Sequence, residues 1–318
     1  TLYSFYASKN TNITRQSNLF LSATYTYLKQ SNYSAFGTIW LPNNKYHFVL
    51  DAYINKFPAN FYGVGNNTRA ADVDAINNTG SRIIVEAERK LGKVFYGGIT
   101  GIYQADKYFD IAPIGIYTTD TSLQARSGGK ELFTGVSLIY DTRDYASYST
   151  SGNYVRLNIA IAPKYGPDFY GLTRYQFQSR SFFMLNHEKK HSFALHTVFN
   201  SLQGNSIPIY LNGTFGGISI MRGYYTGRYR EQNVALAQLE YRWWPLKRFA
   251  VVPFVGTGEV FRNNAFSIAE LKPNFGAGVR YFFDLPARLT LRIDYGFGEK
   301  RVGEKRSQGL LFAISESF

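Results

Sequence analysis

Four histidines are the residues whose type most readily supports catalysis or metal binding: His47, His187, His191 and His196. His187 and His191 are four residues apart, a spacing that brings two metal ligands together on a helix. They flank Glu-Lys-Lys in a short turn between two predicted strands, however, where that spacing has no such effect. His47 and Asp51 share one face of a predicted strand and could pair a base with a carboxylate, but polar residues lining an interior explain them better. We therefore predict no catalytic site, no metal site and no cofactor.

A second group of chemically capable residues lies in the sequence GTFGGISIMRGYYTGRYREQN, at 213–233. This stretch is basic, aromatic and rich in glycine, and it separates two segments that read as strands. A loop that runs from about 200 to 231 is too long to be a plain connection. Its Gly216 and Gly217 permit backbone turns that residues with side chains resist. We predict that this loop folds back into the interior of the protein.

An arginine in that loop, Arg222, would need a carboxylate once it is buried, because charged hydrogen bonds stabilise a guanidinium away from water. Glu240 lies on the next predicted strand. It points inward together with Gln238 and Arg242 if the aromatic residues beside them face outward. Glu240 is therefore the expected partner of Arg222.

The composition of the 318-residue chain favours an all-β protein in contact with a membrane. Tyr and Phe number 26 each, while Met numbers 2 and Cys 0, and aromatic residues make up 17% of the chain. Tyrosine suits the boundary between apolar and aqueous surroundings, such as the surface of a bilayer. No window of about 18 apolar residues exists, which argues against a transmembrane helix. The membrane would therefore be crossed by strands.

The decisive pattern has a period of two, which places successive side chains on opposite faces of a strand. In residues 288–298 one face is apolar (Leu289, Leu291, Ile293, Tyr295, Phe297) and the other is mostly polar (Arg288, Thr290, Arg292, Asp294, Gly296). The same alternation occurs in 173–182 and 153–161. The predicted strands are about 9 to 12 residues long, enough to cross a bilayer at a tilt, whereas soluble strands average about five or six. We predict a transmembrane antiparallel β-barrel with apolar side chains outside and polar side chains inside.

Fifteen strands are predicted at 2–8, 17–28, 32–41, 45–56, 79–91, 93–104, 131–141, 152–163, 171–185, 190–200, 232–244, 248–261, 273–284, 288–298 and 308–318. Bacterial single-chain barrels have an even number of strands, so we expect sixteen. The missing strand either precedes Thr1 or lies in FDIAPIGIY at 109–117. Short turns alternate with long loops, which are expected on the external side, at 57–79, 105–130, 200–231 and 262–272.

The whole chain, 1–318, is expected to form a single barrel domain. Its first residues, LYSFYAS, already read as a strand, so we expect that any signal peptide has been removed. The net charge of +13 suits anionic partners. Nucleic acid is not expected, because no RNP-type, helix-turn-helix or zinc-finger pattern is present.

The segment MRGYYTGRYR resembles the V/I/L-R-G-F/Y motif in the inward-folded loop of the BamA-type superfamily of outer-membrane assembly and translocation barrels, which includes TamA and the two-partner secretion transporters. Other segments agree in their order along the chain: FYGVGNN at 61–67, YDTRD at 140–144 followed by SGNY, GTFGG before the motif, FVGTGEVF at 254–261, RIDYGFG, and the final FAISESF. The resemblance covers nearly the whole chain. No segment resembles the periplasmic substrate-binding domains of that superfamily.

In that superfamily the motif arginine is held by carboxylates on the following two strands, which locks the loop inside the barrel. The resemblance carries this role to Arg222, with Gly223 and Tyr224 beside it and Glu240 as the first carboxylate. Relatives have an aspartate in a F-V-D-A-G pattern where this chain has glycine, at position 256. The candidates for the second carboxylate are Asp141, Glu259 and Asp294.

The terminal strand, with Phe312 on its apolar face and Phe318 at its end, resembles the strand that the bacterial barrel-assembly machinery recognises. The resemblance implies an integral protein of the bacterial outer membrane, in contact with lipid and lipopolysaccharide, that takes part in protein insertion or translocation. Its expected partners are unfolded outer-membrane or secreted protein clients and other envelope subunits. The alternative is a membrane anchor or port, forming the barrel part of a larger protein or envelope complex. A pore for anionic solutes is a weaker third hypothesis.

Arginines on the predicted inner faces leave a further question open. They could attract acidic clients, or they could pair with acids inside the barrel. The arginines are Arg156, Arg174, Arg180, Arg280 and Arg292, and the acids are Glu86, Glu88, Glu240 and Asp294.

Overall fold

The computed structural model describes residues 1–9, 13–109, 111–166, 169–186 and 190–318. Fifteen antiparallel strands form one sheet in the order β1 to β10 followed by β13 to β17, and each strand pairs with its neighbours in this order. The strands are β1 (Leu2–Phe5), β2 (Ser17–Tyr25), β3 (Ser31–Trp40), β4 (Tyr46–Phe61), β5 (Asp74–Lys90), β6 (Phe95–Phe109), β7 (Gly128–Asp141), β8 (Gly152–Ala162), β9 (Leu172–Met184), β10 (His191–Gly204), β13 (Asn233–Leu246), β14 (Phe249–Phe261), β15 (Lys272–Asp284), β16 (Leu289–Phe297) and β17 (Gln308–Ile314).

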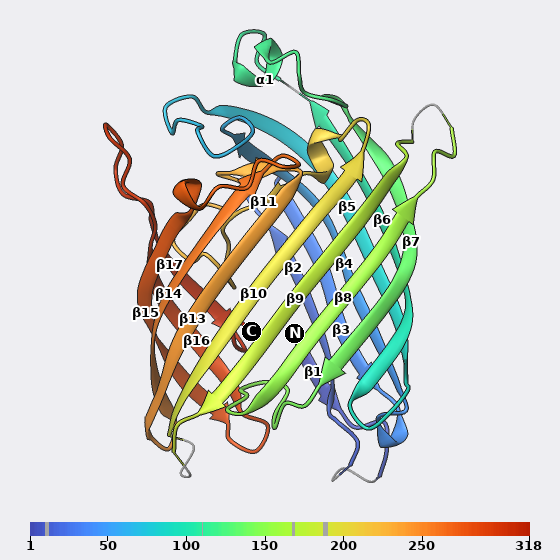
Figure 1. The fold of residues 1–318 in the computed structure, drawn as a ribbon, viewed down its shortest axis with the longest axis vertical. Coiled ribbons are helices and arrows are strands. Elements are labelled where there is room, and N and C mark those ends of the chain that lie inside the picture. Colours follow the sequence, from blue (N-terminus) through green and yellow to red (C-terminus); the bar gives the residue numbers. More distant parts are fainter. Residues whose placement is uncertain (10–12, 110, 167–168, 187–189) are drawn as a thin grey trace.

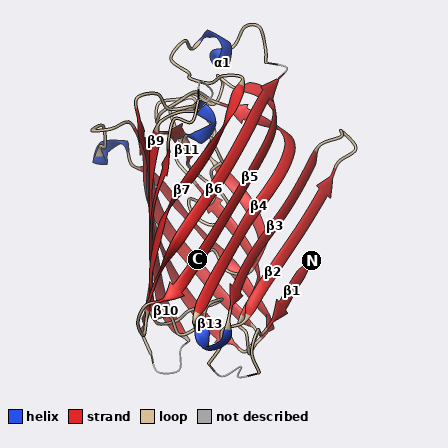
Figure 2. Cartoon of the chain, turned by 90° about the vertical axis from the view of Figure 1, so that its right-hand side faces the viewer, coloured by secondary structure: helices blue, strands red, loops and turns tan. Residues whose placement is uncertain are grey.

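The tilted strands curve around a central lumen (Figures 1 and 2). Short turns, including the 3-10 helix η1 (Pro42–Asn44), join the strands at one end. The opposite end carries long loops with α1 (Ile116–Thr119), η2 (Ile209–Leu211) and η3 (Ile268–Glu270). A two-stranded sheet of β11 (Gly213–Thr214) and β12 (Arg230–Glu231) lies in the longest of these loops. Among the described residues, no helix is both long and apolar enough to cross a bilayer.

The side chains of the main sheet are arranged as in a membrane barrel, inverted relative to a soluble protein. On β16, Leu291, Ile293 and Tyr295 are 39–47% exposed, whereas Arg292 and Asp294, between them, are at most 2% exposed. Apolar residues therefore cover the outside, and charged residues face the lumen, as a bilayer requires. The prediction of an all-β barrel is confirmed.

The predicted strand count is not reached. The described residues contain the fifteen predicted strands in the main sheet, and β1 and β17 form its two edges without pairing to each other. The suggested strand at 109–117 is wrong: Phe109 ends β6, residue 110 lies outside the described residues, and Ile116 begins α1. Pro113 cannot donate a ladder hydrogen bond, and the Asp74 carboxylate instead accepts a hydrogen bond from the Tyr117 amide at 2.8 Å.

The end of the last strand also differs from the prediction. β17 stops at Ile314 rather than continuing to Phe318, because Ser315 adopts a left-handed conformation with φ of 72°. Figures 1 and 2 place the C-terminal end inside the outline of the barrel. The last residues of the chain therefore belong to the lumen and not to the wall.

Candidate functional site

The loop between β10 and β13 enters the lumen as a compact aromatic unit. After β11, the Phe215 amide donates to the Tyr229 carbonyl at 2.9 Å, which continues the pairing begun by β11 and β12. The Phe215 ring packs edge-on against Tyr224 at 4.8 Å and against Tyr229 at 5.7 Å. Gly216 and Gly217, the predicted turn residues, have φ of 90° and 145°. Contacts within the loop therefore stabilise its conformation, in addition to its contacts with the barrel wall.

The turn at Gly223 brings the loop backbone against the backbone of β16. Gly223 has φ of 102°, and a Cβ atom there would lie 2.5 Å from the Gly296 carbonyl carbon. A Cβ atom on Gly296 would meet the Arg222 carbonyl oxygen at 2.4 Å. Such distances are too short for any side chain, so the contact requires glycine on both sides. The neighbouring Tyr224 hydroxyl donates to the Pro273 carbonyl of β15 at 2.7 Å.

Arg222 bridges two strands on one side of the lumen. Its Nη2 lies 2.6 Å from Glu240 Oε1 on β13, and its Nη1 lies 2.8 Å from Asp294 Oδ2 on β16. All three side chains are fully buried. The guanidinium also lies 3.6 Å from the centre of the Phe254 ring, on its face. Two charged hydrogen bonds and a cation–π contact therefore fix the loop at one point.

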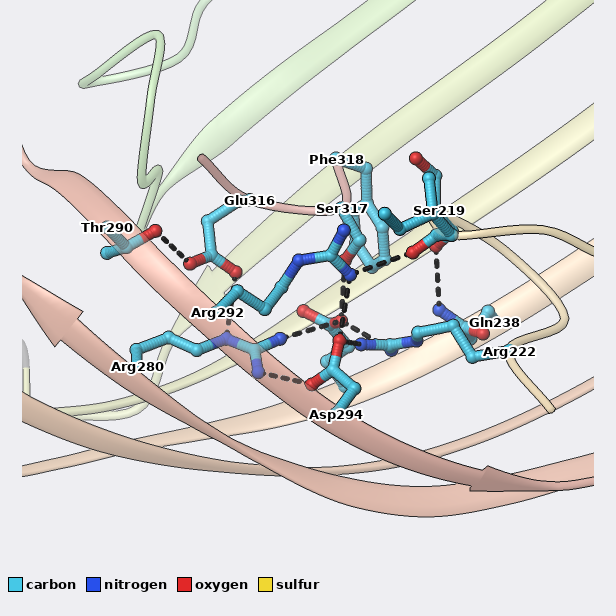
Figure 3. Close-up of polar contacts among 12 residues, drawn as sticks. Ser219, Arg222, Gln238, Arg280, Thr290, Arg292, Asp294, Glu316, Ser317 and Phe318 are labelled. Carbon is cyan, nitrogen blue, oxygen red and sulfur yellow. Dashed lines mark hydrogen bonds and ion pairs between the residues drawn. The ribbon is translucent and has the colours of Figure 1, made fainter. Parts of the chain in front are cut away.

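Three more arginines and one more carboxylate surround Arg222 and its two acids, and we call the set the arginine network: Arg222, Arg242, Arg280, Arg292, Glu240, Asp294 and Glu316. Figure 3 shows Arg222, Arg280, Arg292, Asp294 and Glu316 pointing toward one another. Arg292 shares Asp294 with Arg222 at 2.8 Å. Arg280 bridges Asp294 and Glu316. Each of the three acids contacts at least one arginine, and each of the four arginines contacts at least one acid, so every buried charge in the network has an opposite charge beside it.

The last residues of the chain complete the network. Glu316 Oε2 lies 3.0 Å from Arg280 Nε, and the Ser317 hydroxyl donates to Glu240 Oε1 at 2.9 Å. The Phe318 ring, only 5% exposed, packs 4.7 Å from His196 on β10. The tail thus contacts Glu240 on β13 and His196 on β10, the strand that pairs with β13.

Besides the inward loop and the C-terminal tail, the turn at residues 142–151 contacts the arginine network, from the end of the barrel that carries the short turns. In residues 142–151, Asp144 accepts hydrogen bonds from the Thr150 hydroxyl at 2.7 Å and from the Ser151 amide at 3.2 Å. These bonds fold the segment so that the buried Tyr148 packs edge-on against Phe282 and Trp244, whose rings stack on each other at 4.1 Å.

Arg242 joins this segment to the other two elements. Its Nη1 donates to the Ser149 carbonyl at 3.0 Å, and its Nη2 donates to the Phe318 carbonyl at 3.2 Å. Its Nε donates to Glu240 at 3.0 Å. One side chain therefore links the turn at 142–151, the tail and the carboxylate that contacts Arg222.

Of the three candidates for the second carboxylate, only Asp294 contacts Arg222 in the described part of the chain. Asp141 and Glu259 lie elsewhere. Asp141 pairs with Arg143 at 2.9 Å near the turn that follows β7. Glu259 accepts a hydrogen bond from the Ser267 amide at 3.1 Å near the long loops. Glu316 and Ser317 were not predicted. The sequence analysis placed Arg242 on an inner face and named Arg280 as a possible partner of acids inside the barrel, and Arg280 does pair with Asp294.

The histidines do not form a common site. His47 Nδ1 lies 2.5 Å from Glu88, and His191 Nδ1 lies 2.6 Å from the Tyr241 hydroxyl. His196 packs against Phe318, and His187 lies outside the described residues. Within the described ranges, no three His, Asp or Glu residues are arranged to hold a metal ion. The contacts described here hold the loop against the barrel wall.

Comparison with known proteins gives the family of the fold. The model of the Omp85 superfamily domain matches residues 12–318. The chain is similar to BamA from Haemophilus ducreyi lacking POTRA domains 1–3, with 11% identity over 94% of this chain and 64% of that chain, at a TM-score of 0.61. It is also similar to CdiB from Acinetobacter baumannii, with 14% identity over 95% of this chain and 53% of that chain, at a TM-score of 0.56. At these identities the likeness establishes the fold alone, and the chain spans less than two thirds of either structure. No curated protein matches.

Proposed function

This chain belongs to the Omp85 superfamily, and from that membership we propose that it takes part in inserting or translocating proteins at the bacterial outer membrane. At the level of the family, outer-membrane protein insertion or translocation is supported by the domain match and by the two similar barrels. Its role in one of these processes, with a particular client, is our proposal.

The observation that carries the proposal is the fixed position of the inward loop. Arg222 connects the loop to β13 and β16 through two buried carboxylates, and Gly223 lies directly on the backbone of β16. A loop held in this way fills one side of the lumen. The edge strands β1 and β17 remain free to pair with a strand of a client protein. Strand addition at such an edge uses backbone hydrogen bonds and needs neither a catalytic residue nor a nucleotide.

We propose that the long loops face the exterior and the short turns face the periplasm, as in other outer-membrane barrels. The apolar outer surface would contact lipid, and the loops would contact lipopolysaccharide. The clients would be unfolded outer-membrane or secreted proteins, and other envelope subunits would be further partners. The role of Arg222, Gly223, Tyr224 and Glu240 as the lock is part of the same proposal, with Asp294 as the second carboxylate.

The experiment that tests this function is reconstitution of the protein in liposomes, followed by addition of an unfolded barrel client. We expect the client to reach its folded, protease-resistant form faster than in empty liposomes. Arg222→Ala should reduce the acceleration, and Lys247→Ala, at an exposed turn residue, should leave it unchanged. No acceleration by the wild-type protein would refute the proposal.

A second candidate is a membrane anchor or port for a larger assembly. It is favoured by the lengths of the similar structures, of which the chain covers only 64% and 53%. In this case the reconstituted barrel alone would not accelerate folding, but it would retain a partner domain at the membrane. The liposome assay separates the two candidates, because only the first candidate accelerates folding of the client by itself.

A further inference from the structure

Three adjacent strands of the barrel wall contain no acidic residue at all. Within their described bounds, β8, β9 and β10 have neither Asp nor Glu. Acids occur on strands to either side, including Glu86 and Glu88 on β5, Glu131 on β7 and Glu240 on β13. The lumen therefore has one wall whose charge is purely cationic, and we call the inner faces of β8, β9 and β10 the acid-free wall.

The middle strand of this wall presents a regular polar column. Arg174, Gln176, Gln178 and Arg180 alternate along β9 with outward residues such as Phe177, which is 36% exposed. All four members of the column are partly exposed, whereas Arg222 and Arg280 in the arginine network are fully buried. The lumen beside β9 is therefore accessible, in contrast to the filled side beside β13 to β17.

The two arginines of this column have no carboxylate partner in the described chain. The other lumenal arginines of the sequence analysis do: Arg156 contacts Glu86 and Glu88, and Arg280 and Arg292 contact Asp294. Arg174 instead lies 4.7 Å from the centre of the Phe133 ring, and Arg180 lies 5.4 Å from that of Tyr154.

The residue opposite Arg180 on β10 adds a second unsatisfied group. His196 is the register partner of Arg180, and it is only 4% exposed. Neither of its ring nitrogens has a hydrogen-bond partner within the described part of the chain. Buried polar groups normally have such partners. This end of the acid-free wall thus combines an unpaired cation with unused hydrogen-bonding capacity.

We propose that the acid-free wall binds an extended, acidic segment of a client polypeptide, which makes this inference dependent on the proposed function. Arg174 and Arg180 are six residues apart on one strand, or roughly 20 Å at about 3.3 Å per residue. An extended segment of similar length with a carboxylate near each end contacts both arginines. Gln176 and Gln178 lie between them and can donate to, and accept from, its peptide groups. Electrostatic complementarity selects acidic over neutral segments.

The first test measures binding of two labelled synthetic peptides to the full protein in detergent micelles by fluorescence anisotropy. One peptide carries aspartates spaced to match the arginines, and the other has asparagine at the same positions. We expect the acidic peptide to bind at least about tenfold more tightly, because its aspartates can accept charged hydrogen bonds from both arginines and the asparagines cannot. The double variant R174Q/R180Q should remove this preference, and the exposed double variant K247Q/K305Q should keep it. Equal binding of both peptides, or an unchanged preference in R174Q/R180Q, would overturn the proposal.

The second test locates the bound peptide. A photo-crosslinking amino acid at Gln178 should react with the acidic peptide, and the same group at the neighbouring Phe177, which faces outward, should not. Crosslinking from both positions, or displacement of the peptide by inorganic phosphate at equal concentration, would count against a peptide site. Neither test requires client folding. The peptide-binding proposal can therefore be refuted while liposome acceleration persists, and peptide binding can be observed while liposome acceleration is absent.

Discussion

Arg222 and Asp294 lie 72 residues apart in the sequence, yet Nη1 of the arginine is 2.8 Å from Oδ2 of the aspartate in the fully buried interior of the barrel. Glu240, the other carboxylate on Arg222, is on β13, and two strands separate it from Asp294 on β16. The arginine therefore connects two parts of the wall that are not hydrogen-bonded to each other. Its removal should affect the loop and the wall together.

Arg222→Ala should release the inward loop and destabilise the barrel. Removing one member of a buried ion pair costs about 3–5 kcal/mol because it leaves the partner charge uncompensated. Other arginines remain near both acids here, so we expect the lower part of this range. Urea unfolding in lipid vesicles measures the stability, and trypsin cleavage at Arg228 measures release of the loop.

Two further variants serve as comparisons for this prediction. Arg222→Lys keeps the charge but not the forked geometry, and it should recover only part of the stability. Lys247→Ala should unfold like the wild type. An Arg222→Ala protein with unchanged unfolding and unchanged trypsin resistance would contradict the role of Arg222 as the lock.

The contact between Gly223 and β16 leads to a second prediction. Gly296→Ala places a methyl group 2.4 Å from the Arg222 carbonyl oxygen, so the loop backbone must move. We expect a loss of about 1–3 kcal/mol, as for other overpacked sites. Gly309→Ala is a matched control. Gly309, on β17, is the register partner of Gly296, and a Cβ atom added to Gly309 would meet nothing closer than 3.7 Å. Equal stabilities of the two variants would show that the close approach is unimportant.

Much of the fold could be predicted from the sequence, because side-chain alternation is a local property. All fifteen predicted strands occur in the main sheet, and several extend beyond their predicted bounds into the long loops. The errors arose where local pattern was weak. Residues 111–115 mix apolar residues with Pro113, and only the neighbouring Asp74 explains why a helix begins at Ile116.

The geometry of the site was less predictable. The period-two pattern placed both Glu240 and Asp294 on inner faces. It does not predict which of the inward-facing acids contacts the loop between β10 and β13. The inward turn of Ser317 and Phe318 was also hidden, because an alternating pattern through Ser315 reads as a continuing strand. Those contacts depend on the curvature of the whole sheet, which brings β10 and β13 close to the residues that follow β17. A short window of sequence does not encode such a long-range arrangement.

The two phenylalanines of the terminal strand should behave differently, which is a third prediction. Phe318 is 5% exposed and packs on His196, whereas Phe312 is 63% exposed on the outer face. Phe318→Ala should cost about 3–5 kcal/mol through loss of buried contacts. Phe312→Ala should cost less than about 1 kcal/mol. Unfolding in vesicles measures both, and a larger loss for Phe312→Ala would show that the tail is not packed in the lumen.

The segment at 142–151 carries a pH dependence, which is a fourth prediction. Burial opposes ionisation of Asp144, but hydrogen bonds from Thr150 and Ser151 and the charge of Arg288 outweigh it and lower the pKa of this carboxyl below its usual range. A carboxyl whose pKa is lowered by folding stabilises the folded state above its unfolded pKa of about 3.9. That contribution is lost as the pH falls through the lower, folded value.

Hydrogen exchange of the Thr150 and Ser151 amides measures this loss directly, because both donate to Asp144. Their protection, corrected for intrinsic exchange rates, should be constant above about pH 5 and should fall below about pH 4. The Thr142 amide, which donates to the Asn153 carbonyl in the same turn, should keep its protection. Asp144→Asn should remove the pH dependence. A parallel fall at Thr142, or a fall that persists in Asp144→Asn, would assign the change to another group, and Tyr148 would then be held in the barrel without help from this carboxylate.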